Sequence, residues 1–400
     1  MGCHSYRTAS RLDKTVLPLD KKINIGMEVI SLKTGKIIYS HNPDRYFIPA
    51  STEKVLTALA ALAELGQDFQ FKTQLLEDKH SNLTIKFEGD PVLTEGDLFN
   101  LFKELKVKFP EKTFNNIMID LNDHDLPLLM PGWMIGDAES CYGAPVNRAI
   151  LNKNCTYDKE KQRVAVKVRH INAAMKKNIL TQVTAHHIAY TGKIKVYSKL
   201  RSRPEKTLVL EHSSPSLFVL LHEGLKDSDN LIMEALFIKL VEDKLPIDRA
   251  WQERGEPLKE LILKYYGVDL AEASTVDGSG LTRYNLITPH QLTAILVSAY
   301  KNNKVRPELL SLLPIAGIDG TLKNRMRKGL AYGKIRAKTG GMTGLISLAG
   351  FGEDKRGEAF AFTIMINQFV GSAEDQRNLV DHLCEIMIDH QYLLGKEKVD

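Results

Sequence analysis

The sequence of 400 residues is poor in the features that mark metal-binding and membrane-spanning proteins. It has only four cysteines, and their spacing matches no metal-ligand pattern. No stretch approaches the roughly 18 consecutive apolar residues of a transmembrane helix. The first residues lack the apolar segment of a signal peptide, so we expect that a leader is absent from this version of the chain. We therefore expect no metal, no cofactor and no transmembrane segment.

Charge of one sign is not concentrated anywhere in the chain. The 54 Lys and Arg residues exceed the 49 Asp and Glu residues by a net charge of +5, and they are dispersed rather than gathered in a block. This pattern does not motivate a nucleic-acid partner. The mild basicity equally suits a protein that works beside an anionic cell-wall polymer or a membrane surface.

Two of the cysteines, Cys141 and Cys155, lie in one segment. They would form a disulfide in an oxidising compartment, and two buried thiols are the alternative. The spacing alone does not decide between these two states.

The periodicity of the chain predicts strands at both ends and helices between them. Residues 23–48 indicate a hairpin, and residues 334–367 indicate three strands at hairpin spacing. Helical periodicity covers much of 216–312 and returns at 373–393. The stretch 150–212 alternates β-branched and polar residues, which we interpret as further strands.

This order of elements indicates an α+β protein with one domain inserted into another. A chain of 400 residues is too long for one compact core. If the early and late strands share one sheet, residues 1–70 and 216–400 form a single discontinuous domain. Residues 71–215 are then a β-rich insert.

The first candidate for catalysis lies at the start of a predicted buried helix. Residues 55–65 are rich in Leu and Ala and contain no helix breaker. A spacing of three places Ser51 and Lys54 one turn apart, so the lysine amine can reach the serine hydroxyl and take its proton. The same Ser-x-x-Lys pattern recurs at residues 298–301, which we interpret as the end of an ordinary helix. The motif alone is therefore weak evidence.

A second candidate is Ser228-Asp229-Asn230, where one predicted helix ends and the next begins. The Ser228 hydroxyl could relay a proton to a leaving amine. The Asn230 side chain could hydrogen-bond a substrate amide and hold Lys54 in place. The same pattern at residues 40–42 belongs to a hairpin edge.

A third candidate is Lys338-Thr339-Gly340-Gly341, on a predicted strand. A cation beside a hydroxyl suits a substrate carboxylate, and two glycines leave room for another backbone to pair with the strand. The backbone N–H groups of Ser51 and Gly341 could then form an oxyanion hole. The same Lys-Thr-Gly pattern recurs at residues 33–35, in a predicted hairpin turn, so this motif alone is also weak evidence.

The three patterns become specific when they occur in this order and in these settings. Ser-x-x-Lys on a helix, Ser-x-Asn at a helix junction and Lys-Thr-Gly on a strand together characterise penicillin-binding proteins and β-lactamases. The physics agrees, because burial of Lys54 beside the second cation, Lys338, would lower the pKa of Lys54 and favour its action as a base.

With these motifs in view, the chain resembles the D-alanyl-D-alanine carboxypeptidase/endopeptidase family, the class C low-molecular-mass penicillin-binding proteins. The resemblance runs from about residue 23 to 390 and implies a β-lactamase-like domain, an antiparallel sheet flanked by helices. The phrases that carry it lie at residues 48–54, 89–93, 131–133, 143–146, 277–283, 313–322 and 348–351.

The resemblance implies hydrolysis of the D-Ala-D-Ala bond in peptidoglycan stem peptides, cleavage of crosslinks, and acylation by β-lactams. Ser51 would form the acyl-enzyme and Lys54 would act as the base. Ser228 and Asn230 would complete the proton relay.

By the same resemblance, Lys338, Thr339, Gly340 and Gly341 would bind the substrate. Asp137 would pair with the amino group of diaminopimelate, with Tyr142 beside it; a loop-capping role is the alternative for Asp137. Arg283 resembles a substrate-facing arginine and is otherwise a surface cation. Thr343 is a further substrate contact.

Two departures from the family pattern stand out. The stretch between Ser51 and Ser228 is shorter than in long members of the family, which implies a reduced insert. Gly341-Met342 follows Lys338-Thr339-Gly340 where the family more often has a small hydroxyl residue and a leucine, which would alter the edge of the cleft without removing the backbone donor.

Two other functions share part of this evidence. A β-lactamase carries the same three motifs, but this chain shows no recognisable deacylating Glu motif. A catalytically idle peptidoglycan-binding protein would not need the intact motifs. We predict a periplasmic enzyme, with association at a membrane surface as an option and with its oligomeric state left open. His186-His187 lacks a third metal ligand and is interpreted as a polar strand end.

Overall fold

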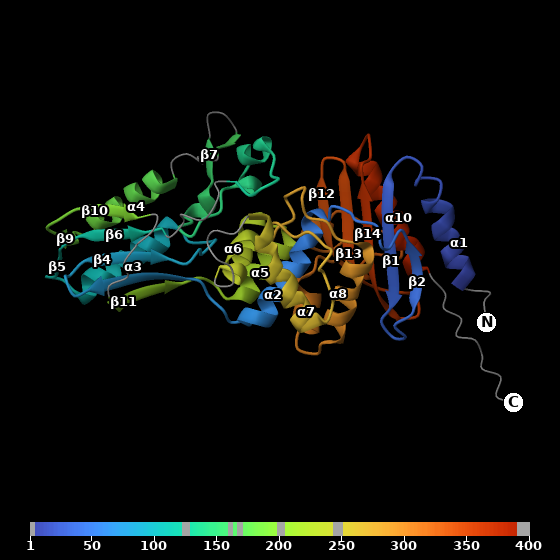
Figure 1. Cartoon of the computed structure of the whole chain (residues 1–400), viewed down its shortest axis with the longest axis horizontal. Coiled ribbons are helices and arrows are strands. Elements are labelled where there is room, and N and C mark those ends of the chain that lie inside the picture. Colours follow the sequence, from blue (N-terminus) through green and yellow to red (C-terminus); the bar gives the residue numbers. More distant parts are fainter. Residues whose placement is uncertain are drawn as a thin grey trace. The chain divides into compact units, whose positions relative to one another are not determined.

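The computed structural model describes residues 5–121, 129–158, 163–165, 171–197, 205–242 and 251–389. Within these residues the chain forms two compact units (Figure 1). Unit 1 comprises Met1–Leu65, Leu221–Asp229 and Leu240–Asp400, and unit 2 comprises Gly66–Leu220 and Asn230–Lys239. The insert predicted at 71–215 falls within the range of unit 2.

Unit 1 is built on a five-stranded antiparallel sheet in the order β12-β13-β14-β1-β2. Asn24 at the start of β1 pairs with Asn367 at the end of β14, so strands from opposite ends of the chain are neighbours. The prediction that the early and late strands share one sheet is therefore confirmed. The strands are β1 (Asn24–Ser31), β2 (Ile37–His41), β12 (Ile335–Met342), β13 (Leu345–Glu353) and β14 (Ala359–Asn367).

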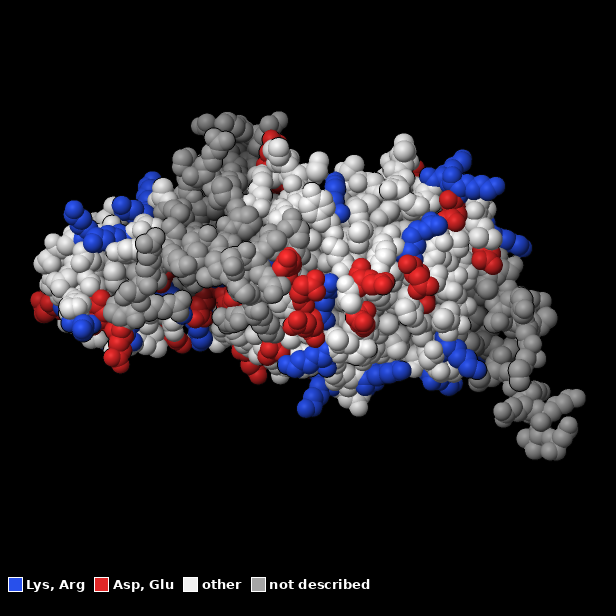
Figure 2. Space-filling model, in the orientation of Figure 1, with Lys and Arg blue, Asp and Glu red and all other residues white. Residues whose placement is uncertain are grey.

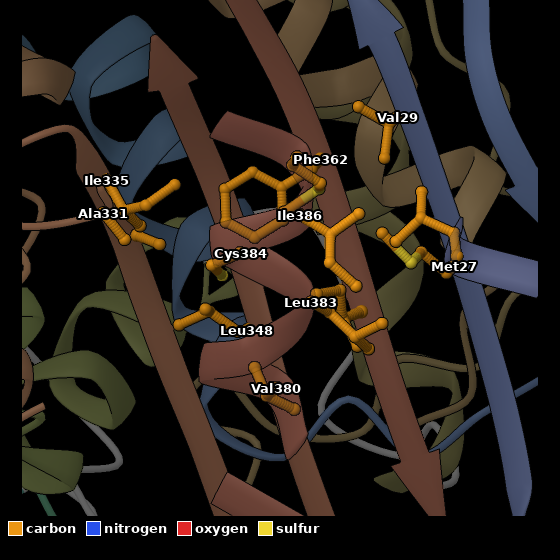
Figure 3. Close-up of a cluster of buried hydrophobic side chains, with 14 of the residues drawn as sticks. Met27, Val29, Ala331, Ile335, Leu348, Phe362, Val380, Leu383, Cys384 and Ile386 are labelled. Atoms are coloured by element: carbon orange, nitrogen blue, oxygen red, sulfur yellow. The ribbon is translucent and has the colours of Figure 1, made fainter. Parts of the chain in front are cut away.

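One face of this sheet is covered by the predicted C-terminal helix, α10 (Ala373–Ile388). Its buried residues Val380, Leu383 and Cys384 pack with Leu348 of β13 and Phe362 of β14 (Figure 3). Burial raises the pKa of the Cys384 thiol, so this cysteine is a core residue rather than a reactive one.

A helix at the N-terminal end, α1 (Ser5–Val16), packs against α10 and was not predicted. Its Leu12 and Val16 are four residues apart and fully buried in the same core cluster. The segment is otherwise polar, so the two apolar residues gave too little periodicity for a prediction.

Helices α2 and α5 to α9 belong to unit 1, except that α5 is divided between the two units and most of α6 belongs to unit 2. Helix α8 contacts β1, β13 and β14, and α2 contacts α7. Helices α5 and α6 each cross a boundary between the two units. The helices are α2 (Lys54–Leu65), α5 (Leu217–Lys226), α6 (Asn230–Val241), α7 (Glu256–Tyr266), α8 (Pro289–Lys301) and α9 (Arg306–Leu312), with 3-10 turns η1 (Ala50–Glu53), η6 (Trp251–Gly255) and η7 (Gly320–Leu322).

Unit 2 has its own five-stranded sheet, in the order β10-β6-β4-β3-β11, with helices α3 and α4 packed together beside it. The prediction of strands throughout 150–212 is wrong for α4, whose Met175, Ile179 and Val183 recur every four residues and are buried. The elements are β3 (Lys72–Asp78), β4 (Leu83–Phe87), α3 (Glu95–Lys108), β5 (Thr113–Phe114), β6 (Ile117–Asp120), η2 (Ile135–Glu139), η3 (Cys141–Gly143), η4 (Asn152–Asn154), β7 (Thr156–Asp158), β8 (Arg163–Ala165), α4 (Ile171–Ala185), β9 (Ala189–Tyr190), β10 (Ile194–Tyr197) and β11 (Lys206–Ser213).

The charged side chains do not gather into one basic surface on the face shown in Figure 2. Blue Lys and Arg side chains alternate there with red Asp and Glu side chains over the described residues. Among the helices that the structure describes, none combines the length and the apolar character needed to cross a membrane.

Candidate active site

Ser51 and Lys54 lie at the junction of η1 and α2 in unit 1. Ser51 is on the 3-10 turn, and the α-helix begins at Lys54. The Lys54 Nζ donates to the Ser51 Oγ over 2.9 Å. Lys54 is fully buried, whereas Ser51 is partly exposed, so the hydroxyl is accessible while the amine is shielded from bulk water. This is the arrangement of a serine nucleophile beside a lysine base.

The Lys54 ammonium has a second acceptor that the sequence analysis missed. Lys54 Nζ donates to the backbone carbonyl of Ser279 over 2.7 Å. Ser279 lies in a turn held by Asp277, whose carboxylate accepts the N–H groups of Gly280 and Thr282. Gly280 has a φ of +77°, and a Cβ there would lie 1.9 Å from the Ala50 carbonyl. Only glycine therefore allows this turn to approach η1 closely enough to hold Lys54.

Lys338 on β12 is the second buried cation of the site. It is fully buried, and its Nζ donates to the Ser228 Oγ and to the Thr339 carbonyl, each over 2.9 Å. Burial lowers the pKa of Lys338 well below its usual range, and the charge of Lys54 lowers it further. Because Coulomb repulsion is mutual, the pair disfavours a state in which both amines carry a proton.

Ser228 lies between α5 and α6 with a φ of +63°, a left-handed conformation that is uncommon for a residue other than glycine. The conformation turns the chain so that the hydroxyl meets Lys338. Backbone strain of this kind often marks a functional site. The structure thus brings Ser228 and Lys338, 110 residues apart in the chain, into direct contact.

The outer edge of β12 is paired only in its first half. Ala337 donates its N–H to the Pro314 carbonyl, and the Ile335 carbonyl accepts the N–H of Ala316, so these two residues face away from β13. Since backbone direction alternates along a strand, the backbone groups of Thr339 and Gly341 also face outward. The Thr339 carbonyl accepts from the Lys338 Nζ. The outward N–H groups of Thr339 and Gly341 form a strand edge of the kind that pairs with an extended peptide.

Gly340 allows this edge to lie against the turn that carries Ser51. A Cβ on Gly340 would be 2.1 Å from the Ser347 Oγ and 2.8 Å from the Pro49 carbonyl. Such distances are far below normal contact, so any side chain would separate β12 from η1. Gly341 is exposed, and a Cβ there would make only ordinary contacts, 3.6 Å from the Ile346 side chain and 3.9 Å from the Leu345 carbonyl.

Three further predicted residues lie around the end of β12. The Thr339 Oγ1 donates to the Thr321 Oγ1 over 2.7 Å, so Thr321 is a second residue that the sequence analysis did not identify. The Arg283 guanidinium contacts the Met342 sulfur over 3.4 Å. Thr343 is exposed in the turn between β12 and β13.

Unit 2 brings together the other three predicted residues, Asp137, Tyr142 and Asn230. The Asp137 carboxylate accepts the Tyr142 hydroxyl over 3.2 Å and the Met134 N–H over 2.9 Å. The Asn230 amide donates to the Tyr142 carbonyl over 2.9 Å. The Tyr142 side chain is 51% exposed.

The neighbouring residues fix the turn that holds Asp137 and Tyr142. A disulfide joins Cys141 to Cys155, which settles the alternative left open by the sequence. A Cβ on Gly143 would be 2.2 Å from the Asp137 carbonyl, so this close turn requires glycine.

The histidine pair does not form a metal site with other described residues. The His186 ring packs against the Phe99 ring at a tilt of 59°, with ring centroids 4.4 Å apart. Burial and the charge of Lys103 lower the pKa of His186. Among the described residues, no group of His, Cys, Asp and Glu could hold a metal ion.

A family model for the D-Ala-D-Ala carboxypeptidase 3 (S13) family matches residues 9–162 and 156–388. The chain is 28% identical to the D-alanyl-D-alanine carboxypeptidase DacB of Haemophilus influenzae, over 86% of each chain. The crystal structure of penicillin binding protein 4 (dacB) from H. influenzae is similar with a TM-score of 0.81 and 26% identity, over 96% of this chain and 99% of the other. A complex of that protein with a β-lactam has a TM-score of 0.74 and 26% identity, over 96% of this chain and 100% of the other.

Proposed function

Because this chain belongs to the D-Ala-D-Ala carboxypeptidase 3 (S13) family, whose members are serine hydrolases, we propose that it cleaves D-alanyl bonds of peptidoglycan stem peptides through an acyl-enzyme on Ser51. The observation that supports this role most strongly is the pair of contacts Ser51–Lys54 and Ser228–Lys338, each 2.9 Å long. They supply a nucleophile, a base and a second hydroxyl in one unit. Cleavage of the terminal D-Ala-D-Ala bond and of crosslinks uses the same chemistry.

In the acylation step, neutral Lys54 accepts the proton of Ser51 as the Oγ attacks the carbonyl carbon of the penultimate D-Ala. The C–N bond then breaks, and the terminal D-Ala leaves as an amine after it receives a proton. That proton is the one that Lys54 took from Ser51, and Ser228 relays it to the leaving nitrogen, so Lys54 is neutral again. The Ser228 hydroxyl is held in place by the Lys338 amine. In deacylation, water attacks the acyl carbon and gives a proton to Lys54. Lys54 returns this proton to the Ser51 Oγ as the bond between Oγ and the acyl carbon breaks.

The substrate backbone lies along the free edge of β12. The outward N–H of Gly341 and the N–H of Ser51 stabilise the oxyanion that forms on the attacked carbonyl. The hydroxyls of Thr339 and Thr321, which are hydrogen-bonded to each other, offer an O–H to the terminal carboxylate. Arg283 and Thr343 border the same end of the strand.

The choice of stem peptide rests on unit 2. Asp137 carries a carboxylate oriented by two hydrogen bonds, which suits the free amino group of diaminopimelate. Tyr142 offers an exposed aromatic ring beside it. Asn230 binds a substrate amide. The disulfide next to this cluster agrees with an oxidising compartment, and we place the enzyme in the periplasm.

The decisive experiment is mass spectrometry of the intact protein and its peptides after incubation with a penicillin, with Ser51→Ala as the comparison. We expect a stable adduct on the peptide that contains Ser51 and none in the variant. Rapid turnover of nitrocefin without an adduct would instead identify a β-lactamase. Failure to bind penicillin, to turn over nitrocefin or to release D-Ala from a muropeptide would leave only the binding-protein function.

A further inference from the structure

An ion pair between buried Lys226 and partly exposed Asp319 begins two residues before Ser228, outside the three motifs. Lys226, the last residue of α5, is 5% exposed. Its Nζ donates to the Asp319 carboxylate over 2.6 Å and to the Leu313 carbonyl over 2.7 Å. Both partners belong to the segment 313–322. A buried ammonium with two acceptors holds this segment to the end of α5.

The segment that Lys226 holds is attached to β12 on both sides of Lys338. Before Lys338, Pro314 and Ala316 form the hydrogen bonds to the outer edge of β12. After it, Thr321 accepts the hydroxyl of Thr339. The segment therefore fixes the strand around the second catalytic amine.

Asp319 gives this segment its shape. Its Oδ2 accepts from Lys226, and its Oδ1 accepts the N–H of Ile315 over 2.7 Å. The next residue, Gly320, has a φ of +52°, and a Cβ there would be 2.7 Å from the Lys226 carbonyl. The backbone of the segment thus rests directly on the residue whose amine binds it.

We propose that Lys226 and Asp319 are positioning residues, which set the Ser228 hydroxyl against the Lys338 amine and the Thr339 edge. In this proposal, neither residue contacts the substrate; both act through the position of Ser228. The backbone at Ser228 needs support from neighbouring residues because its φ of +63° is strained. The helix gives no such support, since it ends at Lys226. This inference rests on the proposed function, since it concerns the geometry of the same reaction.

The test measures the acylation rate constant per active site with a fluorescent penicillin. The fraction of active sites is titrated separately, so that loss of folded protein does not count as loss of rate. In Lys226→Met, we expect the rate constant to fall about 10- to 100-fold, because small misplacement of reacting groups has effects of that size. Asp319→Asn keeps an acceptor for the Ile315 N–H, so we expect a smaller fall in its acylation rate constant. It also serves as the second variant if Lys226→Met folds poorly.

Lys259 provides a matched control in the same unit. It is 8% exposed, its Nζ donates to the carbonyls of Ala271 and Ala273, and it pairs with Glu256 over 2.8 Å. Lys259→Met removes the same kind of buried cation away from β12. We expect its acylation rate per active site to equal that of the wild type.

A double-variant cycle separates positioning from general stability. If Lys226 acts through Ser228, Lys226→Met should change the rate by no more than about threefold in a Ser228→Ala background. The inference would be overturned if Lys226→Met and Asp319→Asn both had the same acylation rate constant per active site as the wild type. It would also be overturned by the same fold-loss from Lys226→Met in both backgrounds. Absence of acylation in the wild type would instead refute the proposed function.

Discussion

The Ser347 hydroxyl donates to the Pro49 carbonyl over 2.6 Å, which ties the second strand of the sheet to the turn that carries Ser51. Gly340 lies beside this hydrogen bond, and its lack of a side chain lets the Ser347 hydroxyl reach the Pro49 carbonyl. The nucleophile is therefore placed by the sheet as well as by its own helix.

We expect Gly340→Ala to separate η1 from β12. The added Cβ would be 2.1 Å from the Ser347 Oγ and 2.8 Å from the Pro49 carbonyl, so backbone must move. Overpacking of this kind costs about 1–3 kcal/mol of unfolding free energy. We expect the midpoint urea concentration of denaturation and the rate constant of penicillin acylation both to fall. Gly341→Ala is the stability control, because its Cβ would make only ordinary contacts, with the Ile346 side chain and the Leu345 carbonyl. Equal denaturation midpoints for the two variants would contradict this explanation.

The pKa of Lys338 predicts how stability depends on pH. Its pKa in the folded protein is lowered from 10.5 by burial and by Lys54, so the unfolded chain binds more protons between the lowered value and 10.5. The free energy of unfolding should therefore rise with pH across that window, by at most about 1.4 kcal/mol per pH unit for one proton. Below the window both states are protonated and this slope disappears.

Lys338→Met removes the titrating group, so its denaturation midpoint should vary less with pH across that window than the wild-type midpoint does. The variant should also lose acylation, because Ser228 no longer has its amine partner. Parallel pH profiles for the two proteins would show that Lys338 is not the group responsible.

Reduction of the disulfide should affect substrate choice more than chemistry. Cys141 and Cys155 are 14 residues apart, and closure of a loop of about this length stabilises a fold by about 3 kcal/mol in the chain-entropy account. In Cys141→Ser/Cys155→Ser, we expect a lower melting temperature and a raised KM for diaminopimelate peptides. Penicillin acylation should keep its rate, and Cys384→Ala, which leaves the disulfide intact, should keep the wild-type KM.

Removal of the charge at Asp137 tests its role in recognising an amine. Asp137→Asn keeps the shape and weakens the attraction to the diaminopimelate amino group. We expect kcat/KM for the free-amine peptide to fall about tenfold, which corresponds to one charge-assisted hydrogen bond. The same peptide with an acetylated amine should be cleaved equally by both proteins. An equal loss on both peptides would assign Asp137 to the loop-capping alternative.

The sequence allowed prediction of those parts of the site that depend on short, local patterns. Ser51 and Lys54 are one turn apart, and Lys338 to Gly341 lie on a strand whose hydrophobic neighbours are evident. Ser279 was missed because it contributes a backbone carbonyl, which has no signature in its side chain. Thr321 was missed because its contact with Thr339 depends on how a loop folds back.

The fold was predictable to a similar degree. The strands of unit 1 are strongly apolar and could be located from the amino-acid sequence. The helix α4 was interpreted as strand because its mixture of β-branched and polar residues concealed a four-residue spacing of Met175, Ile179 and Val183. In α1, the buried residues Leu12 and Val16 lie among polar residues, and the tertiary packing reveals their role.

The pairing of β1 with β14 also determines when this protein can acquire its native state. β1 lies between β2 and β14, and its partner Asn367 is separated from Asn24 by nearly the whole chain. During synthesis, β1 and β2 must wait with one edge unpaired until β14 has been made, whereas most of unit 2 comes from one continuous stretch. Such long-range pairing slows folding and prolongs exposure of an apolar edge. A chain that stops after β13 would leave one edge of β1 without β14, so we expect the newly made chain to be most prone to aggregation before its last strand is complete.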